Sequence, residues 1–172
     1  MKRLLLLRHA KSSWHDPTLT DFERPLNRRG RVAARVIGDY LVRKGMLPDL
    51  VLCSAAQRTR ETLAFIQDRL DQDLPASIEK SLYEASPGEI ARIVKKVDSR
   101  FDTVMVIGHN TGLEELARRL SRKGNEKSQK LMALKYPTGA LADIEISGKG
   151  WWKLDGKDAS LKRFVWPRDL EG

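Results

Sequence analysis

Two short apolar runs in this chain each end next to a histidine. Residues 4–7 are four leucines followed by Arg8-His9, and residues 104–108 read Val-Met-Val-Ile-Gly before His109. A continuous apolar run of this length, flanked by segments of helical periodicity, predicts a parallel strand buried on both faces. Ligands of open α/β sheets bind beyond the carboxyl ends of such strands. We therefore expect both histidines to lie in one crevice at the edge of a sheet.

Strands and helices are predicted to alternate along most of the chain. Strands are expected near residues 3–7, 50–53 and 78, with a fourth ending at Gly108. One helix is expected to follow Asn27 as its N-cap and to end near Gly45. Ser54 and Gln57 form a capping-box pair, so another helix is expected to begin at Ala55. Further helices are expected from Pro87 and from about Thr111 to Leu120.

The C-terminal third of the chain has a different pattern. Residues 121–135 are rich in Lys, Ser and Gln and are expected to be exposed. Strands are then predicted at 141–146, 151–154 and 161–165, with a turn near Gly156 and with Trp151, Trp152 and Trp166 packing on the hairpin. The whole pattern predicts one domain over 1–172, a three-layer α/β/α sandwich with a mostly parallel central sheet and a C-terminal β hairpin.

Composition limits the partners and the compartment. The 172 residues include 32 Lys and Arg but 23 Asp and Glu, a formal net charge of +9 that favours anionic partners. The single cysteine, Cys53, excludes an internal disulfide and fits a reducing compartment. The leucine run is too short for a signal peptide, and no stretch approaches membrane-spanning length. We expect a cytoplasmic protein without membrane partners, and the sequence leaves its oligomeric state open.

Arg8, His9, Arg58 and His109 are the candidates for a phosphate site. A neutral imidazole at His9 can attack phosphorus, and the Arg8 guanidinium can bind two phosphoryl oxygens. Arg58 lies in a first helical turn, where the helix dipole disfavours a cation unless an anion is bound. A protonated His109 beside a helix N-terminus could bind another oxygen. Each residue taken alone also fits a structural role, such as a strand-end histidine bonding a backbone carbonyl.

Other phosphate and metal chemistries fit the sequence less well. A cysteine phosphatase needs an arginine six positions after its cysteine, but Thr59 stands there and Arg58 comes one position early. No Walker phosphate loop occurs. Metal binding by His9, His15 and His109 is disfavoured by the nearby arginines, so no metal and no cofactor are expected. Cys53 is interpreted as a small core residue.

Glu84 is the candidate proton donor. It lies in the segment Leu-Tyr-Glu-Ala-Ser-Pro at residues 82–87, after the third predicted strand. A carboxyl group that reaches the crevice could protonate a leaving group and later accept a proton from water. An ordinary surface glutamate is the competing interpretation.

Together these residues resemble the histidine phosphatase superfamily, whose fold is shared by cofactor-dependent phosphoglycerate mutases. The matching landmarks occur in the family's order: residues 7–10 (Leu-Arg-His-Ala), 26–30 (Leu-Asn-Arg-Arg-Gly), Ser54 with Arg58 and Thr62, 82–84 (Leu-Tyr-Glu), and 108–110 (Gly-His-Asn). Ala10 and Ala55 depart from residues common in the family, but neither removes a charged group. The resemblance implies that His9 is phosphorylated, that Arg8, Arg58 and His109 bind phosphate, and that Glu84 donates a proton.

Within the superfamily the chain is similar to the SixA-type phosphohistidine phosphatases. Residues 8–12, Trp14 and residues 21–26 resemble the opening of that branch. Only about 25 residues separate Glu84 from His109, which leaves no room for the helical lid of mutase-like members. The resemblance implies an open site and a substrate that is phosphohistidine on a protein.

Two alternatives remain open at this point. A mutase or a phosphatase for small phosphate esters would use the same fold. A protein of another class, a basic nucleic-acid-binding or non-catalytic phosphate-binding domain, would fit the net charge and the stretch containing Lys123, Lys127, Lys130 and Lys135. No recognisable nucleic-acid motif accompanies those lysines, which argues against nucleic acid as the partner.

Overall fold

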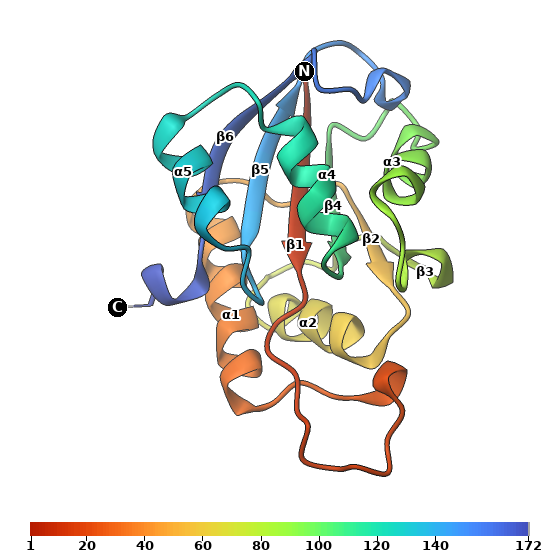
Figure 1. Cartoon of the computed structure of the whole chain (residues 1–172), viewed down its shortest axis with the longest axis vertical. Helices are drawn as coiled ribbons and strands as arrows, with labels where there is room; N and C mark the ends of the chain where they lie inside the picture. Colours follow the sequence, from red (N-terminus) through yellow and green to blue (C-terminus); the bar gives the residue numbers. More distant parts are fainter. Residues whose placement is uncertain (172) are drawn as a thin grey trace.

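A six-stranded sheet forms the centre of the computed structural model, which describes residues 1–171 (Figure 1). The strand order is β3-β2-β4-β1-β5-β6. β1 to β4 are mutually parallel, while β5 pairs antiparallel with both β1 and β6. The strands are β1 (Lys2–Arg8), β2 (Leu50–Ser54), β3 (Ala76–Glu79), β4 (Thr103–Gly108), β5 (Leu141–Ile146) and β6 (Ala159–Val165).

Helices cover both faces of this sheet, which confirms the predicted three-layer architecture (Figure 1). One face packs against α1 (Arg28–Arg43) and α2 (Gln57–Gln67), and the other packs against α3 (Pro87–Lys95), α4 (Gly112–Leu120) and α5 (Glu126–Leu134). Successive strand residues point to opposite faces, so each buried strand serves both cores. In β1, Leu5 and Leu7 face the α1 layer, while Leu4 and Leu6 face the α4 layer.

The start of α1 is anchored on the segment that follows β1. The Asn27 side chain accepts a hydrogen bond from the Gly30 N–H at 2.8 Å, as predicted for the N-cap. The Asn27 N–H donates to the carbonyl of Lys11 at 3.0 Å. A Cβ on Gly30 would lie 2.1 Å from that same carbonyl oxygen, so a glycine is needed there. This contact fixes the chain two residues beyond His9.

The predicted capping box at Ser54 is wrong. Ser54 is the last residue of β2 and is paired with Glu79 of β3, so α2 begins at Gln57 with Ala56 as its N-cap and no side-chain cap. The Ser54 hydroxyl instead lies 2.8 Å from Nε2 of His109. The strand extends further than the local pattern indicates, and this turns the serine toward the crevice.

The C-terminal third agrees with one prediction and corrects another. Residues 121–135 are mostly exposed, as predicted, and they contain the helix α5, which Asn125 caps and which buries Met132. The segment predicted as a strand at 151–154 is a short 3₁₀ helix, Trp151–Lys153, because the buried Trp151 ring donates its N–H to the carbonyl of Phe101. The antiparallel pair is therefore formed by β5 and β6 across a longer connection.

The three tryptophans of this region differ in their surroundings. Trp151 is fully buried, Trp166 donates its ring N–H to the carbonyl of Lys135, and Trp152 is largely exposed. Hairpin packing is thus the wrong interpretation for Trp152. None of the helices within residues 1–171 is long and apolar enough to cross a membrane.

Candidate active site

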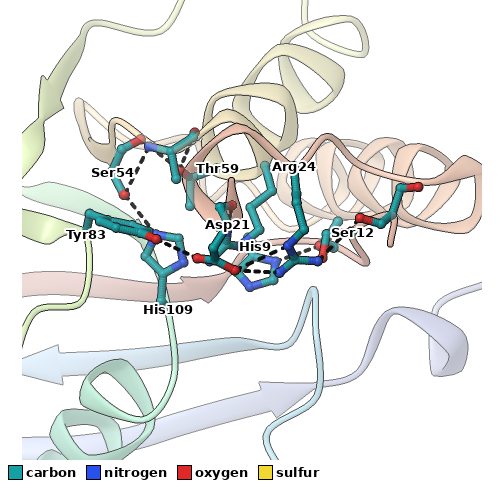
Figure 2. Close-up of polar contacts among 12 residues, drawn as sticks. His9, Ser12, Asp21, Arg24, Ser54, Thr59, Tyr83 and His109 are labelled. Carbon is teal, nitrogen blue, oxygen red and sulfur yellow. Dashed lines mark hydrogen bonds and ion pairs between the residues drawn. The ribbon is translucent and has the colours of Figure 1, made fainter. Parts of the chain in front are cut away.

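The carboxyl ends of β1, β2 and β4 bring the predicted site residues together. Arg8 is in register with Gly108, so His9 and His109 leave adjacent strands at the same edge. Their ring centroids lie 5.3 Å apart, and both side chains are buried. Arg58 enters from the first turn of α2, as predicted. Figure 2 shows the two imidazoles side by side in this crevice.

His9 is held by a hydrogen bond to the backbone of the next residue. Its Nδ1 lies 2.7 Å from the carbonyl oxygen of Ala10, and because a carbonyl only accepts, Nδ1 carries the proton. Burial lowers the pKa of His9 to about 3, against the opposing effect of that hydrogen bond. The ring is therefore neutral at pH 7, and its Nε2 holds a free lone pair. His9 therefore makes the hydrogen bond to a backbone carbonyl that a structural role would require, and the same bond leaves its Nε2 unprotonated, as attack on phosphorus would require.

The charge of His109 depends on its burial. Burial, with the positive charge of Arg58 as the next cause, lowers the pKa of His109 to about 4. This lowered pKa favours a neutral His109 in the free protein at pH 7, whereas the protonated form was expected with a phosphoryl group bound. When the Ser54 hydroxyl donates to Nε2, the ring proton resides on Nδ1, a buried atom with no partner within residues 1–171. His109 then presents a neutral N–H donor.

The two arginines each present an unused donor in the same region. Arg8 donates one N–H to the carbonyl of Tyr136 at 3.1 Å, but its buried Nε has no partner in the described part of the chain. The same holds for Nε of Arg58, whose side chain is also buried. Unpaired buried N–H groups are costly, so their clustering indicates a site that an anion completes.

Asp21 is a site residue that sequence reasoning missed. Arg58 donates to the Asp21 backbone carbonyl at 2.7 Å and to its carboxylate at 3.1 Å. The position of Arg58 in the first turn of α2 predicted an anionic partner. In the free protein that partner is the carboxylate of Asp21, in the loop between β1 and α1. The same carboxylate accepts hydrogen bonds from Tyr83 at 2.5 Å and from Arg24 (Figure 2).

This network sets the charges at the mouth of the crevice. The hydrogen bond from Tyr83 is the largest cause that lowers the pKa of Asp21 to about 2, and Arg24 and Arg58 act in the same direction. Burial and Asp21 together raise the pKa of Tyr83 to about 12. At pH 7 the pair is therefore a carboxylate and a neutral phenol. Tyr83 also packs edge-on against the His109 ring, with the centroids 5.4 Å apart.

Glu84 lies next to the site but is not joined to it. It is exposed, and within residues 1–171 its carboxylate makes no hydrogen bond or ion pair. Its backbone has a φ of 57°, a left-handed conformation that is uncommon for residues other than glycine. The following residue, Ala85, packs its carbonyl against Gly112, where a Cβ would come within 2.0 Å. The strained loop thereby holds Glu84 beside the start of α4.

The environment of Cys53 confirms its interpretation as a core residue. Its side chain is fully buried among the α1-layer residues, and burial raises the pKa of the thiol to about 12. Such a thiol stays protonated and is a poor nucleophile. Thr59, which occupies the arginine position of a cysteine phosphatase, bonds instead to the carbonyls of Ser54 and Ala56.

Thr62 links the helix of Arg58 to the chain segment that follows β1. Its hydroxyl donates to the carbonyl of Arg58 at 2.7 Å and accepts from the N–H of Ala10 at 3.0 Å.

The third histidine, His15, lies exposed in the loop between β1 and α1. Asp21 and Tyr83 fall within the landmarks at residues 21–26 and 82–84, but those landmarks did not assign either residue a place in the site, because their hydrogen bond joins residues 62 positions apart.

Comparison with known proteins gives a consistent result. The model of the histidine phosphatase superfamily (branch 1) matches residues 4–105. An uncharacterized chloroplastic protein of Arabidopsis thaliana is 37% identical over 166 residues, which cover 90% of this chain and 76% of that protein.

Two solved structures are similar to this chain in fold. One, assigned as a phosphohistidine phosphatase SixA from Nakamurella multipartitia, is 26% identical, with a TM-score of 0.84 and 96% of each chain covered. The alpha-ribazole phosphatase from Shigella flexneri is 18% identical, with a TM-score of 0.67 and 96% of each chain covered. At that identity the second likeness concerns the fold alone.

Proposed function

This chain belongs to the histidine phosphatase superfamily, branch 1, and we propose that it removes phosphoryl groups from phosphohistidine on a protein. It is a phosphatase with a histidine nucleophile. The assignment of His9 as that nucleophile, and of a phosphorylated protein as the substrate, is the proposal. We also infer a cytoplasmic location, since a single unpaired cysteine fits a reducing compartment.

The state of His9 is the observation that supports the proposal most directly. Its Nδ1 is committed to the carbonyl of Ala10, and its low pKa leaves Nε2 unprotonated at neutral pH. A histidine with a purely structural role gains nothing from having its second nitrogen free beside two unpaired arginine donors. A phosphorus atom in line with Nε2 would place its oxygens near those donors.

In the first step, Nε2 of His9 attacks phosphorus and the bond from phosphorus to the substrate's nitrogen breaks. The substrate's phosphohistidine ring, protonated on its other nitrogen before attack, leaves as neutral imidazole, and the phosphoryl group is held on His9. Arg8 and Arg58 would neutralise the charge on the equatorial oxygens, with Arg58 exchanging the Asp21 carboxylate for the phosphoryl group. A bound dianion favours protonation of His109, so the cationic form expected from the sequence belongs to the complex and not to the free protein.

In the second step, water attacks the phosphohistidine on His9. Phosphate leaves, and the imidazole returns to its neutral state. Glu84 would accept the proton of that water. The residues between Glu84 and His109 form α3, which packs on the sheet, and β4, which is a strand of the sheet, so no lid from this segment covers the crevice. An open site suits a phosphoryl group displayed on a protein surface.

The covalent step is tested by trapping the enzyme during turnover. The protein is mixed with a ³²P-labelled phosphohistidine peptide in EDTA and quenched with base. We expect acid-labile, base-stable label on the wild type and on His15→Ala, whose histidine lies outside the crevice. His9→Ala should carry no label. Label that persists in His9→Ala, or its absence from the wild type, would remove His9 as the nucleophile.

The substrate class is tested through Glu84. Imidazole leaves readily once protonated, whereas an alcohol needs a proton from a general acid, a contribution of about 100-fold or more. Glu84→Gln should therefore slow hydrolysis of an alkyl phosphate by about 100-fold and of phosphohistidine by about threefold or less. Equal slowing of both substrates would contradict the proposal. A higher wild-type kcat/KM for the alkyl phosphate would favour a small phosphate ester as the natural substrate.

A further inference from the structure

A basic pocket lies beside the catalytic crevice and is not used by the proposed mechanism. Its volume is about 770 Å³, within the range of ligand-binding sites. Five cationic side chains line it against one carboxylate, that of Glu171. The cations are Lys11, Arg28, Arg29, Lys135 and Arg168. We call this the basic pocket.

The basic pocket shares a wall with the catalytic site. That wall is the segment 135–139, which carries Lys135 into the pocket. On its other side, the Tyr136 carbonyl accepts from the Arg8 guanidinium, and the Gly139 N–H donates to the carbonyls of Arg8 and His9. Lys11, two residues after His9, lines the pocket from the opposite side. A ligand in the pocket therefore lies along the same strand end as the nucleophile.

The opposite wall places arginines where a helix disfavours them. Arg28 and Arg29 are the first two residues of α1, whose first turn contains no acidic residue. The positive end of the helix dipole repels them, so their placement has a cost in the free protein. Within residues 1–171, neither arginine has an ion-pair partner, and the same is true of Lys11 and Lys135. These unpaired cations indicate that this wall binds a negatively charged ligand.

The details of the basic pocket favour an extended acidic peptide over a compact phosphate or a nucleotide. The Gly30 N–H at the start of α1 is already taken by the Asn27 side chain, so it is not available to a compact phosphate. The guanidinium of Arg168 lies 5.0 Å from the Trp166 ring centroid, which leaves less of that ring for a base to stack on. Apolar surface from Val32 and Pro137 lies between the cations. The C-terminal segment runs beside α1 (Figure 1), and residues from both segments line the pocket.

We propose that the basic pocket binds an acidic segment of the phosphorylated protein and so aligns its phosphohistidine with His9. This inference rests on the proposed function for its substrate, but the binding step is independent of catalysis. Electrostatic complementarity of this kind acts mainly on encounter and orientation. The pocket would therefore determine which phosphoproteins are good substrates.

Charge reversal in the first turn of α1 tests the binding step. In Arg28→Glu/Arg29→Glu, acidic residues stand where the helix dipole favours them, so folding is retained and is checked by thermal melting. The control is Lys149→Glu/Lys157→Glu, which changes the net charge equally at the connection between β5 and β6. That connection follows Ile146, which pairs with Lys2 at the opposite end of β1 from His9.

The probe for binding is a fluorescein-labelled, unphosphorylated glutamate-rich peptide followed by anisotropy. We expect the pocket variant to bind it about tenfold more weakly than the control variant does. Equal weakening in both variants would mean that only net charge matters and would overturn the inference. The inference would also be overturned if the acidic peptide failed to bind the wild type, while ATP bound the wild type and bound the pocket variant more weakly.

The catalytic consequence uses two phosphohistidine peptides of equal length, with glutamate or glutamine flanks. In the wild type, we expect kcat/KM to be higher for the glutamate peptide, and in the pocket variant the ratio of the two kcat/KM values should fall about tenfold. An unchanged ratio would overturn the inference. If neither peptide is hydrolysed by any of the proteins, the proposed function fails, and the anisotropy measurement still decides whether the pocket binds acidic peptides.

Discussion

Acidification should destabilise this protein through two buried histidines, His9 and His109. Burial holds the pKa of His9 at about 3 and that of His109 at about 4, while an unfolded imidazole titrates near 6.5. The folded-state values are the lower ones, so between these limits the unfolded chain binds more protons. Stability contributed by both neutral imidazoles is therefore complete above pH 6.5 and is lost as the pH falls below it.

The size of the effect follows from those pKa values. Lowering the pH from 7 to 5 protonates each imidazole in the unfolded chain but not in the folded one, which costs the folded state about 2 kcal/mol for each histidine. His9 and His109 together should reduce the free energy of unfolding by about 4 kcal/mol. This is a large part of the stability of a typical domain.

Urea unfolding at pH 7, 6 and 5 measures this loss. His9→Asn/His109→Asn removes both titrations and should lose about 4 kcal/mol less than the wild type over the same range. His15→Asn, which alters an exposed loop residue, should behave like the wild type. Carboxylates titrate in all three proteins, so the difference isolates the two imidazoles. Equal losses in the wild type and the double variant would refute the claim that burial keeps these histidines neutral.

Three further substitutions test contacts seen only in the folded protein. Asp21→Asn removes the carboxylate that pairs with Arg58, so orthophosphate should bind about fivefold more tightly by calorimetry; weaker binding would mean that the carboxylate is needed to position Arg58. Gly30→Ala drives a Cβ to 2.1 Å from the Lys11 carbonyl and should lower the free energy of unfolding by more than about 2 kcal/mol; a neutral result would show that the loop yields freely. Trp151→Ala empties a fully buried site and should cost about 3–5 kcal/mol in urea unfolding, whereas a loss below 1 kcal/mol would contradict the packing described above.

The order of strands and helices could be predicted because it depends on local pattern. Apolar runs such as residues 4–7 need no knowledge of their neighbours to be recognised as buried strands. The helix that Asn27 caps was likewise visible from the cap itself. Local pattern failed at Trp151, where an aromatic-rich segment typical of a strand forms a 3₁₀ helix, because a distant backbone carbonyl captures the ring N–H.

The sequence by itself determined where Arg8, His9, Arg58 and His109 would gather, since parallel strands and the helices that follow them share one edge. Tertiary structure alone decided what those residues encounter there. Asp21 reaches Arg58 across 37 positions, and burial makes His109 neutral. The basic pocket likewise joins segments from both ends of the chain. Strand order follows from short-range periodicity, whereas charge state and ion pairing depend on desolvation and on contacts between distant segments, which no local pattern records.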